Sequence, residues 1–413
     1  MLSQRMASIP TTLHTPPLRR LLAAQIPADF ADWLDFVAIG ALLAFGWDAE
    51  PLAFAYVAAA VGLPYVVVGP IAGAVVDRAD IRTVLIASNV GRAVATACLF
   101  LATDLPTLML IVAIRSSMDA FYSPAKQAAI QSLAPPHERQ AANGISHGIN
   151  QASKIAAPAL GGLLLVLLAP GMVFLINAAV SLVAAMILIG MPIIARDRGL
   201  GNGTLSITLS LKEGYQTVAG APVLRGALLV MALGYFSMFF YDTLIAPLIR
   251  GFGFNQTMFA IAIAAVGLGG VLGAFWLGLG KDKKHPFIWV AIGSGISGIL
   301  AIVLGISQSG GYPIGFAAIT GLFAVLGFCS AIVVVPIRTV IQNETPPDKI
   351  ARVSALGEAA NTTALLVAPF IGAAIATATS VGTVFVLGGV LLGGVASYAT
   401  MLNRRISAIS NQI

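Results

Sequence analysis

The sequence predicts an all-α integral membrane protein with twelve transmembrane helices in two six-helix halves. Its composition, its long apolar runs and a weak internal repeat support this prediction. Of the 413 residues, 58% are hydrophobic and 10% are charged, whereas soluble domains contain about 45–50% apolar and about 25% charged residues. Because so few charges cannot cover a water-facing surface, lipid is the expected solvent.

Twelve apolar runs are long enough to cross a bilayer, which requires about 20 mostly apolar residues. Short polar connections separate the runs, which cover residues 19–46, 52–76, 83–102, 106–133, 141–168, 171–194, 223–250, 255–280, 286–306, 313–340, 351–378 and 380–402. The expected divisions are a tail 1–18, a first half 19–194, a central linker 195–222, a second half 223–402 and a tail 403–413.

The cations between the runs fall in alternate loops. One set of loops and tails holds almost all of them, namely Arg19, Arg20, Arg78, Arg82, Arg139, Arg196, Arg198, Lys212, Lys281, Lys283, Lys284, Lys349, Arg352, Arg404 and Arg405. The opposite set holds only Arg250, beside Asp48, Glu50 and Asp104. By the positive-inside rule, we expect both termini and the linker to be cytoplasmic, in the plasma membrane or bacterial inner membrane. The polar, proline-bearing N-terminus has no signal-peptide pattern.

Charge and cysteine usage exclude two other classes. The net charge of +6 is scattered among apolar runs and forms no basic stripe of the kind that binds nucleic acid. Cys98 and Cys329 both lie in apolar runs and have no metal-ligand spacing. We therefore expect no nucleic-acid partner, no metal and no cofactor.

The two halves repeat each other weakly. PPHERQAANGISHGINQASKIAAPALGG (135–162) aligns without gaps on residues 346–373, and GLPYVVVGPIAGAVVDR (62–78) aligns on residues 267–283. Parallel six-helix repeats are the build of a secondary transporter, with its substrate site between the halves near the mid-membrane plane. The glycine-dense GLGGVLG (267–273) is expected to allow close helix approach.

At these motifs the chain resembles the major facilitator superfamily along its whole length, which implies the MFS fold. GPIAGAVVDRADIRTV (69–84) resembles the loop motif between the second and third spans of that superfamily. It keeps Gly69, Gly73, Asp77, Arg78 and Arg82, with Ala79-Asp80 in place of the usual second glycine turn. The resemblance implies a gating segment: the acid would latch the cytoplasmic side closed, and the glycines would let the second span pack tightly.

Two further stretches carry the resemblance. Residues 144–162 resemble the fifth-span motif of the antiporters and share Pro158, Gly161 and Gly162 with it, which adds these residues to the gating set. DWL (32–34) and FYSPAKQAAIQSLAPPHERQAANGI (121–145) resemble the macrolide-efflux and siderophore-export proteins among the drug–proton antiporters. The lysophospholipid transporters share a similar SPAK stretch.

Nine ionisable residues lie deep within the expected spans: Asp29, Asp32, Asp35, Arg92, Arg115, Asp119, Lys154, Asp242 and Glu358. Each charge at the membrane centre costs about 2.5 kcal/mol or more on insertion scales. These groups are therefore expected to be paired, hydrated or neutral inside the bundle. Lys126 and Arg338 are nearer the span ends and are expected to reach the cytoplasmic interface.

Three of the acids share one helix face. Asp29, Asp32 and Asp35 are spaced i, i+3, i+6, and carboxylates this close cannot all ionise cheaply, so at least one is expected to hold a proton. Asp32 and Asp35 are the proton-coupling candidates, and Trp33 and Phe36 beside them are substrate-binding candidates. Asp29 is expected to have a helix-start or interfacial role.

Arg115 and Asp119 are i, i+4 on the fourth span and can form an ion pair. The superfamily's fourth-span arginine lies about here, which implies a coupling role for this pair. A purely structural ion pair is the alternative interpretation, and the same two interpretations apply to Arg92.

A polar stripe on the fifth span has a counterpart on the eleventh. The stripe and its counterpart comprise His147, Asn150, Gln151 and Lys154, and Glu358, Asn361 and Thr362. His147 and Glu358 occupy equivalent places in the two halves. We interpret them as proton-coupling candidates and the other five as substrate-binding candidates; ordinary buried polar packing is the alternative.

Tyr235, Phe239 and Asp242 follow i, i+4, i+7 on the seventh span. Aromatic rings beside one acid suit a bulky amphipathic or cationic substrate. The first two are therefore substrate-binding candidates and the acid is a proton-coupling candidate. Helix packing with an interfacial aromatic belt is the alternative.

The preferred hypothesis is a monomeric secondary transporter that exports amphipathic small molecules, such as drugs, macrolides or siderophore-like compounds, by proton-coupled alternating access. The alternative is a lysophospholipid or other lipid transporter of the same superfamily, which need not use protons. An enzyme is not expected, because the sequence has no metal-ligand spacing, serine elbow or sizeable soluble domain.

Overall fold

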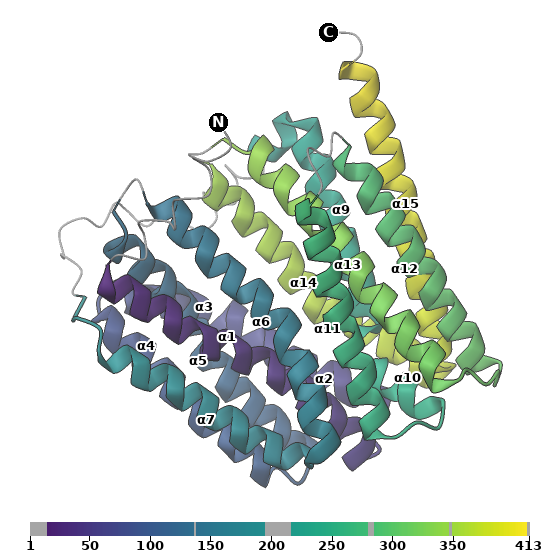
Figure 1. Ribbon diagram of the computed structural model, residues 1–413, viewed down its shortest axis with the longest axis horizontal. Coiled ribbons are helices and arrows are strands. Elements are labelled where there is room, and N and C mark those ends of the chain that lie inside the picture. The colour runs from purple at the N-terminus through teal and green to yellow at the C-terminus, as the bar shows by residue number, and fades with distance from the viewer. Residues whose placement is uncertain (1–14, 136–137, 195–215, 280–284, 347–348, 411–413) are drawn as a thin grey trace. The chain divides into compact units, whose positions relative to one another are not determined.

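The helices of the computed structural model account for every predicted apolar run (Figure 1). The structure describes residues 15–135, 138–194, 216–279, 285–346 and 349–410, and no strand occurs among them. The first half contains α1 (Pro16–Ala41), the π-helical turn η2 (Leu42–Gly46), α2 (Pro51–Val67), α3 (Gly69–Val76), α4 (Ile81–Cys98), the 3-10 turn η3 (Leu99–Leu101), α5 (Leu105–Leu133), α6 (Arg139–Leu167) and α7 (Pro170–Ile189).

The second half contains α9 (Pro222–Asp242), α10 (Ile245–Gly251), α11 (Gln256–Leu279), α12 (Pro286–Ser309), α13 (Phe316–Glu344), α14 (Ile350–Ala378) and α15 (Val381–Ser410). Two predicted spans are broken in the structure. The run 52–76 is α2 followed by α3, bent by 44°, and the run 223–250 is α9 followed by α10. The bend follows from Pro70 in the first turn of α3, because proline lacks the N–H that would continue the helix.

The all-helical membrane class is confirmed. Within the described residues, nine helices are long and apolar enough to cross a membrane, and a tenth span results if α2 and α3 are taken as one. α1 carries three aspartates and two arginines and is therefore more polar than these helices. The exact number of twelve spans stays a prediction.

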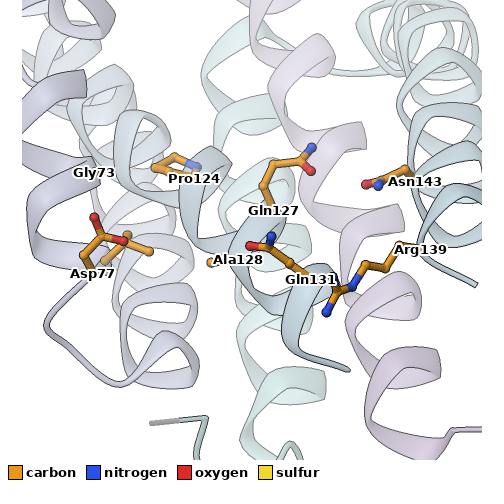
Figure 2. Close-up of a pocket in the computed structure, with 9 residues that line it drawn as sticks. Gly73, Asp77, Pro124, Gln127, Ala128, Gln131, Arg139 and Asn143 are labelled. Atoms are coloured by element: carbon orange, nitrogen blue, oxygen red, sulfur yellow. The ribbon is translucent and has the colours of Figure 1, made fainter. Parts of the chain in front are cut away.

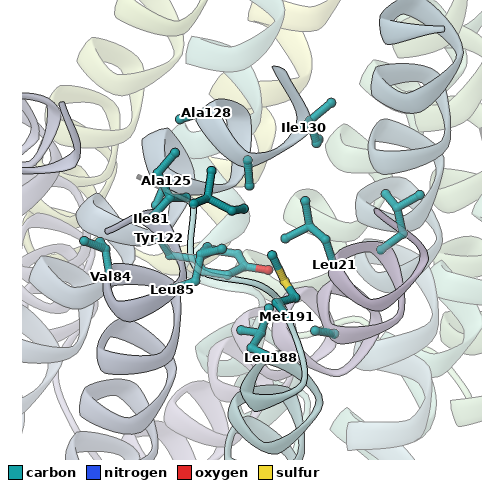
Figure 3. Close-up of a cluster of buried hydrophobic side chains, with 14 of the residues drawn as sticks. Leu21, Ile81, Val84, Leu85, Tyr122, Ala125, Ala128, Ile130, Leu188 and Met191 are labelled. Atoms are coloured by element: carbon teal, nitrogen blue, oxygen red, sulfur yellow. The ribbon is translucent and has the colours of Figure 1, made fainter. Parts of the chain in front are cut away.

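Contacts divide the chain into two compact units, Met1–Ile39 with Ala60–Leu200, and Gly40–Ala59 with Gly201–Ile413. In the first unit α4 packs against both α5 and α7. Figure 3 shows the core that results, with the ring of Tyr122 surrounded by aliphatic side chains. Labelled members of this core are Leu21, Ile81, Val84, Leu85, Ile130, Leu188 and Met191.

The second unit has its own core, in which α12 packs along α15 and α11 along α13. Buried members of this core include Leu224, Val230, Phe287, Val290, Ile337, Ile341, Val395 and Leu402. Since lipid chains are as apolar as these side chains, helix association in a membrane depends on close van der Waals packing rather than on the exclusion of water.

Small residues provide that close packing between α11 and α13, as the glycine-dense stretch predicts. A Cβ atom at Gly269 would lie 1.9 Å from the carbonyl oxygen of Ala324, and one at Gly273 would lie 2.6 Å from that of Phe328. From the other helix, a Cβ atom at Gly327 would lie 1.9 Å from the carbonyl oxygen of Val266. The two backbones are therefore in direct contact, and only glycine fits.

The expected tight packing at Gly69 and Gly73 is wrong. A Cβ atom at either position would meet no atom within 4 Å, so close approach of a neighbouring helix does not explain these glycines. In the fifth-span motif, by contrast, Gly161 on α6 packs against α1, where a Cβ atom would lie 2.6 Å from Leu34 Cδ1.

We predict that Gly269→Ala destabilises the protein by about 1–3 kcal/mol, the usual cost of overpacking. Thermal unfolding in detergent provides the measurement. Gly234→Ala on α9 is the matched control, because a Cβ atom there meets nothing within 4 Å. Equal melting temperatures for the two variants would contradict the backbone contact between α11 and α13.

Candidate functional site

Buried charges from α1, α4 and α5 meet inside the first unit. Arg92 on α4 is fully buried, and its Nη2 donates to the carbonyl oxygen of Ala28 at 2.8 Å. The same guanidinium forms ion pairs with Asp32 and Asp119, the latter with 2.8 Å between Nε and Oδ1. Arg92 therefore belongs to an ionic network, as both of its interpretations from the sequence require.

Arg115 on α5 is the second cation of this network. Its Nη2 lies 2.9 Å from Asp32 Oδ1, and its Nε lies 2.5 Å from Asp35 Oδ2. The expected i, i+4 ion pair with Asp119 is also present, with Nη1 donating to Oδ2 at 3.1 Å. We call these five residues, Asp32, Asp35, Arg92, Arg115 and Asp119, the charge cluster.

The charge cluster has three carboxylates and only two guanidiniums. When all five groups are ionised, it carries one net negative charge inside a membrane protein, where an uncompensated charge is costly. One bound proton makes the cluster neutral. The composition of the cluster thus suits a group of carboxylates that exchanges a single proton.

The three acids differ in how they are held. The side chain of Asp32 is 31% exposed, whereas those of Asp35 and Asp119 are 3% and 6% exposed. Asp35 also accepts hydrogen bonds from Asn177 Nδ2 at 2.6 Å and from Thr96 Oγ1 at 3.2 Å. Asp32 is therefore the acid of the cluster best placed to exchange a proton with its surroundings.

A second polar group surrounds Asp29, and its expected interfacial role is wrong. Asp29 is 2% exposed and accepts from Gln25 Nε2 at 2.7 Å and from Asn150 Nδ2 at 3.2 Å. Lys126 Nζ lies 3.4 Å from its Oδ1, which makes a neutral pair. Asn150, a substrate-binding candidate, therefore serves here to hold an acid of α1.

Lys126 and Arg338 do not reach the interface as expected. Lys126 is 12% exposed and pairs with Asp29, and Arg338 is half-buried and donates from Nη2 to the hydroxyl of Tyr235 at 3.0 Å. Cα–Cβ bonds in a helix tilt toward its N-terminus. Lys126 lies near the C-terminal end of α5 and Arg338 near that of α13. Their Cα–Cβ bonds therefore point away from that end and toward the middle of the helix.

The remaining candidate residues of the first half differ in how far they are buried. Trp33 is half-buried beside the charge cluster in sequence, whereas Phe36 is 44% exposed. Pro158 is half-buried inside α6, and Gly162 is buried. The side chains of His147, Gln151 and Lys154 lie outside the described residues, as do linker residues 195–215 and Asp282, which aligns on Asp77 in the repeat of 62–78 and 267–283.

The second-half candidates form a looser group. Tyr235 and Phe239 stack on α9 with 6.3 Å between ring centroids. Asp242 is the last residue of α9 and half-buried, and on α14 Glu358 is exposed while Asn361 and Thr362 are half-buried. No second charge cluster forms among the described residues of this unit.

Asp80 is a residue that the sequence reasoning missed. Its carboxylate caps α4 by accepting from Thr83 N–H at 3.0 Å and from Arg82 N–H at 3.3 Å. It also accepts from Ile194 N–H, beyond α7, at 2.9 Å. An aspartate directly before an apolar helix is a helix-start signal, which could have identified the cap but not the bond to residue 194.

Two arginines, Arg82 and Arg20, also bind the C-terminal end of α7. Arg82 Nη2 donates to the carbonyl oxygen of Ile189 at 2.6 Å, and Arg20 donates to that of Gly190. Cations are favourable at the C-terminal end of a helix such as α7. Asp77 and Arg78, by comparison, are exposed at the end of α3.

A cavity of about 590 Å³ opens beside this loop (Figure 2). Polar side chains from α5 and α6 line it together with Asp77 and Gly73 of the gating segment. The polar members are Gln127, Gln131, Arg139 and Asn143. None of the proton-coupling candidates whose side chains are described lines the cavity. The gating segment and the charge cluster are therefore separate features of the first unit.

Similarity to known proteins shows the family of this chain. A sequence model of the Major Facilitator Superfamily matches residues 21–369. The chain is 30% identical over 389 residues to the uncharacterized MFS-type transporter YfiS of Bacillus subtilis (strain 168), covering 91% of this chain and 90% of that protein. It is 26% identical over 353 residues to macrolide efflux protein A of Streptococcus pyogenes, covering 83% and 85%.

Solved structures show the same fold at low identity. A POT family transporter in complex with 5-aminolevulinic acid has a TM-score of 0.72 at 12% identity, covering 96% of this chain and 99% of that one. A bacterial homolog of the human lysosomal transporter Spinster has a TM-score of 0.68 at 15% identity, covering 94% and 97%. The chain is a multi-pass integral membrane protein of the transporter class. It belongs to the Major Facilitator Superfamily.

We predict that Arg115→Gln destabilises the protein by about 3–5 kcal/mol, the usual effect of removing one partner of a buried ion pair. Asp32→Asn should have a smaller effect, because it removes the excess negative charge. The double variant Arg115→Gln/Asp119→Asn returns the cluster to its original net charge. It should therefore unfold at a higher temperature than Arg115→Gln alone. A double variant no more stable than the single one would contradict this account.

We predict that Asp80→Ala destabilises the protein by about 1 kcal/mol or more, as loss of a helix cap does. Asp104→Ala is the matched control, because the hydrogen bonds to Asp104 come from Thr107 and Thr103 at the start of its own helix. Its effect on the melting temperature should be smaller. Equal effects would show that the bond from Asp80 to Ile194 contributes nothing.

The effect of Asp80→Ala should depend on pH. Partial burial favours the neutral acid, but hydrogen bonds from Thr83, Ile194 and Arg82 outweigh it and hold the pKa of Asp80 below its usual range. A group with a lowered folded-state pKa stabilises the protein above its unfolded pKa of about 3.9. The difference between wild type and variant should therefore be full at neutral pH and shrink as the pH falls below about 4.

Proposed function

We propose that the chain is a proton-coupled exporter of amphipathic small molecules that works by alternating access. The observation that carries the proposal is the charge cluster, because its excess carboxylate is neutralised by one proton and only Asp32 is substantially exposed. Similarity to macrolide efflux protein A supports export of a bulky amphipathic compound. The protein acts as a monomer in the bacterial inner membrane with both termini cytoplasmic.

The proton step follows from the contacts of Asp32. With the acid ionised, its Oδ1 is shared by Arg92 and Arg115, which ties α1 to α4 and α5. A proton taken up on the acid from the outer side removes its charge and weakens both ion pairs, so α1 is freer to move. Release of the proton to the cytoplasm restores the ion pairs and resets the cycle.

Substrate binding involves aromatic and amide side chains from both halves. Trp33 is adjacent to Asp32 on α1, and Tyr235 with Phe239 presents stacked rings on α9. Asn361 and Thr362 on α14 add polar groups. The link from Asp80 and Arg82 to the end of α7 steadies the gating segment during this cycle.

Proton flux in liposomes tests the proposal. The purified protein is reconstituted with a pH-sensitive dye inside the vesicles, and a panel of macrolides, siderophores and lysophospholipids is added. Wild type should show substrate-dependent proton movement, and Asp32→Asn should reduce it at least tenfold, on the order of the contribution of one acid–base group. Glu50→Gln is the control, because Glu50 is an exposed acid between η2 and α2.

Two outcomes would reject the proposal. Export that continues unchanged when Asp32, Asp35, Asp242 and Glu358 are all neutralised would show that none of these acids couples protons to transport. Lysophospholipid movement that is insensitive to an uncoupler would favour the alternative, a lipid transporter that does not use the proton gradient.

A further inference from the structure

Arg338 on α13 is a cation without a carboxylate partner in the described part of the chain. Its Nη2 donates to the Tyr235 hydroxyl at 3.0 Å, and its buried Nε has no hydrogen-bond partner there. A guanidinium has five N–H donors in a planar fork, and a phenol oxygen satisfies only one of them. A half-buried arginine whose Nε lacks a described partner and whose hydrogen bond goes to a phenol needs an explanation.

The internal repeat supplies a comparison for Tyr235. α1 begins PPLRRLL and α9 begins PVLRGAL, so Pro16, Leu18, Arg19 and Leu22 match Pro222, Leu224, Arg225 and Leu228 without gaps. This alignment, at an offset of 206 residues, places Tyr235 at the position of Asp29. Leu18 and Leu224 are both fully buried, which supports the register.

The same comparison holds for the cation. α5 contains Pro124-Ala125-Lys126, and α13 contains Pro336-Ile337-Arg338, at an offset of 212. Four positions around them are buried in both helices, namely Ala120 with Ile332, Ala125 with Ile337, Ala128 with Val340 and Ala129 with Ile341. Arg338 is therefore the counterpart of Lys126.

The two halves thus contain equivalent cations with different partners. In the first unit Lys126 pairs with Asp29, an acid that is 2% exposed. In the second unit the acid is replaced by Tyr235, and the cation keeps its charge without a counter-ion among the described residues. The position that a carboxylate occupies in one half has no negative group in the other.

We propose that Arg338, with Tyr235 and Phe239, binds the anionic group of an amphipathic substrate, a carboxylate or a phosphate. The planar fork of arginine matches both groups, with two parallel N–H···O bonds. The phenol hydroxyl can donate a further hydrogen bond to the same anion. The stacked rings of Tyr235 and Phe239 provide an apolar surface for the adjoining part of the substrate.

This inference rests on the proposed function only in that the chain binds an amphiphile; it does not require proton coupling. A binding measurement at fixed pH, without a membrane gradient, therefore tests the anion site separately from proton coupling. The proton-coupling variant Asp32→Asn should keep the preference for an anionic ligand. Absence of substrate-dependent proton flux in wild type, with the anion preference intact, would overturn only the transport mechanism.

The test uses the full chain in phosphatidylcholine nanodiscs with two fluorescent probes, 11-(dansylamino)undecanoic acid and its methyl ester. Empty nanodiscs correct for partitioning into lipid. Wild type should bind the acid at least about tenfold more tightly than the ester, as expected for hydrogen bonds to a charged group. Arg338→Gln should remove this preference.

Two further variants control for the effects of misfolding. Tyr235→Asp places an acid where the first half has Asp29, so it should pair with Arg338 internally and abolish the acid preference in a stable protein. Lys126→Gln alters the equivalent cation of the first unit and should leave the preference unchanged. Thermal unfolding confirms that each variant is folded.

Nanodiscs that contain phosphatidylglycerol separate a soluble anion from a membrane lipid. Competition by this lipid in wild type, and its absence in Arg338→Gln, would support the site and identify a lipid phosphate as an occupant. A wild-type acid preference unaffected by the lipid would support a soluble anionic substrate. Equal binding of acid and ester by wild type, or a preference that survives in both Arg338→Gln and Tyr235→Asp, would overturn the proposal.

Discussion

The structure depends on the high cost of an unpaired charge in a low-dielectric interior. Each buried ion that the structure describes in the first unit meets an opposite charge, and the contacts of Arg92 and Arg115 hold α1, α4 and α5 together. These ionic contacts join polar faces of helices whose remaining surfaces can face lipid. The same contacts are the most sensitive elements of the protein, because changing one charge alters the balance of all five groups.

Sites where the charges do not balance are therefore the candidates for binding a proton or a charged ligand. One excess carboxylate in the charge cluster suits reversible proton binding, and one unpaired guanidinium at Arg338 suits an anionic ligand. Lys126, by contrast, is neutralised by Asp29. The two units share a sequence repeat, but their polar interiors have diverged, since the second unit has Tyr235 at the position of Asp29 in the first.

Much of the fold was predictable from the sequence, and less of the candidate site was. Apolar runs and glycine spacing depend on local composition, so they indicated the helices and the contact between α11 and α13. The i, i+4 spacing indicated the pair of Arg115 and Asp119 for the same reason. The inward direction of Lys126 and Arg338 was not recognised, although helix geometry favours it. The bond from Asp80 to Ile194 joins residues 114 positions apart and has no local signature.

The sequence by itself determined the class of protein, the helical runs, the doubled architecture and the set of deep charges, because each of these follows from composition or from short-range periodicity. Only the tertiary structure decided which acid meets which cation, that Asp29 is buried and paired while Asp32 is partly exposed, and that Arg338 has a phenol as its partner. Partners on different helices are chosen by packing in three dimensions, and one sequence read along its length does not contain those distances.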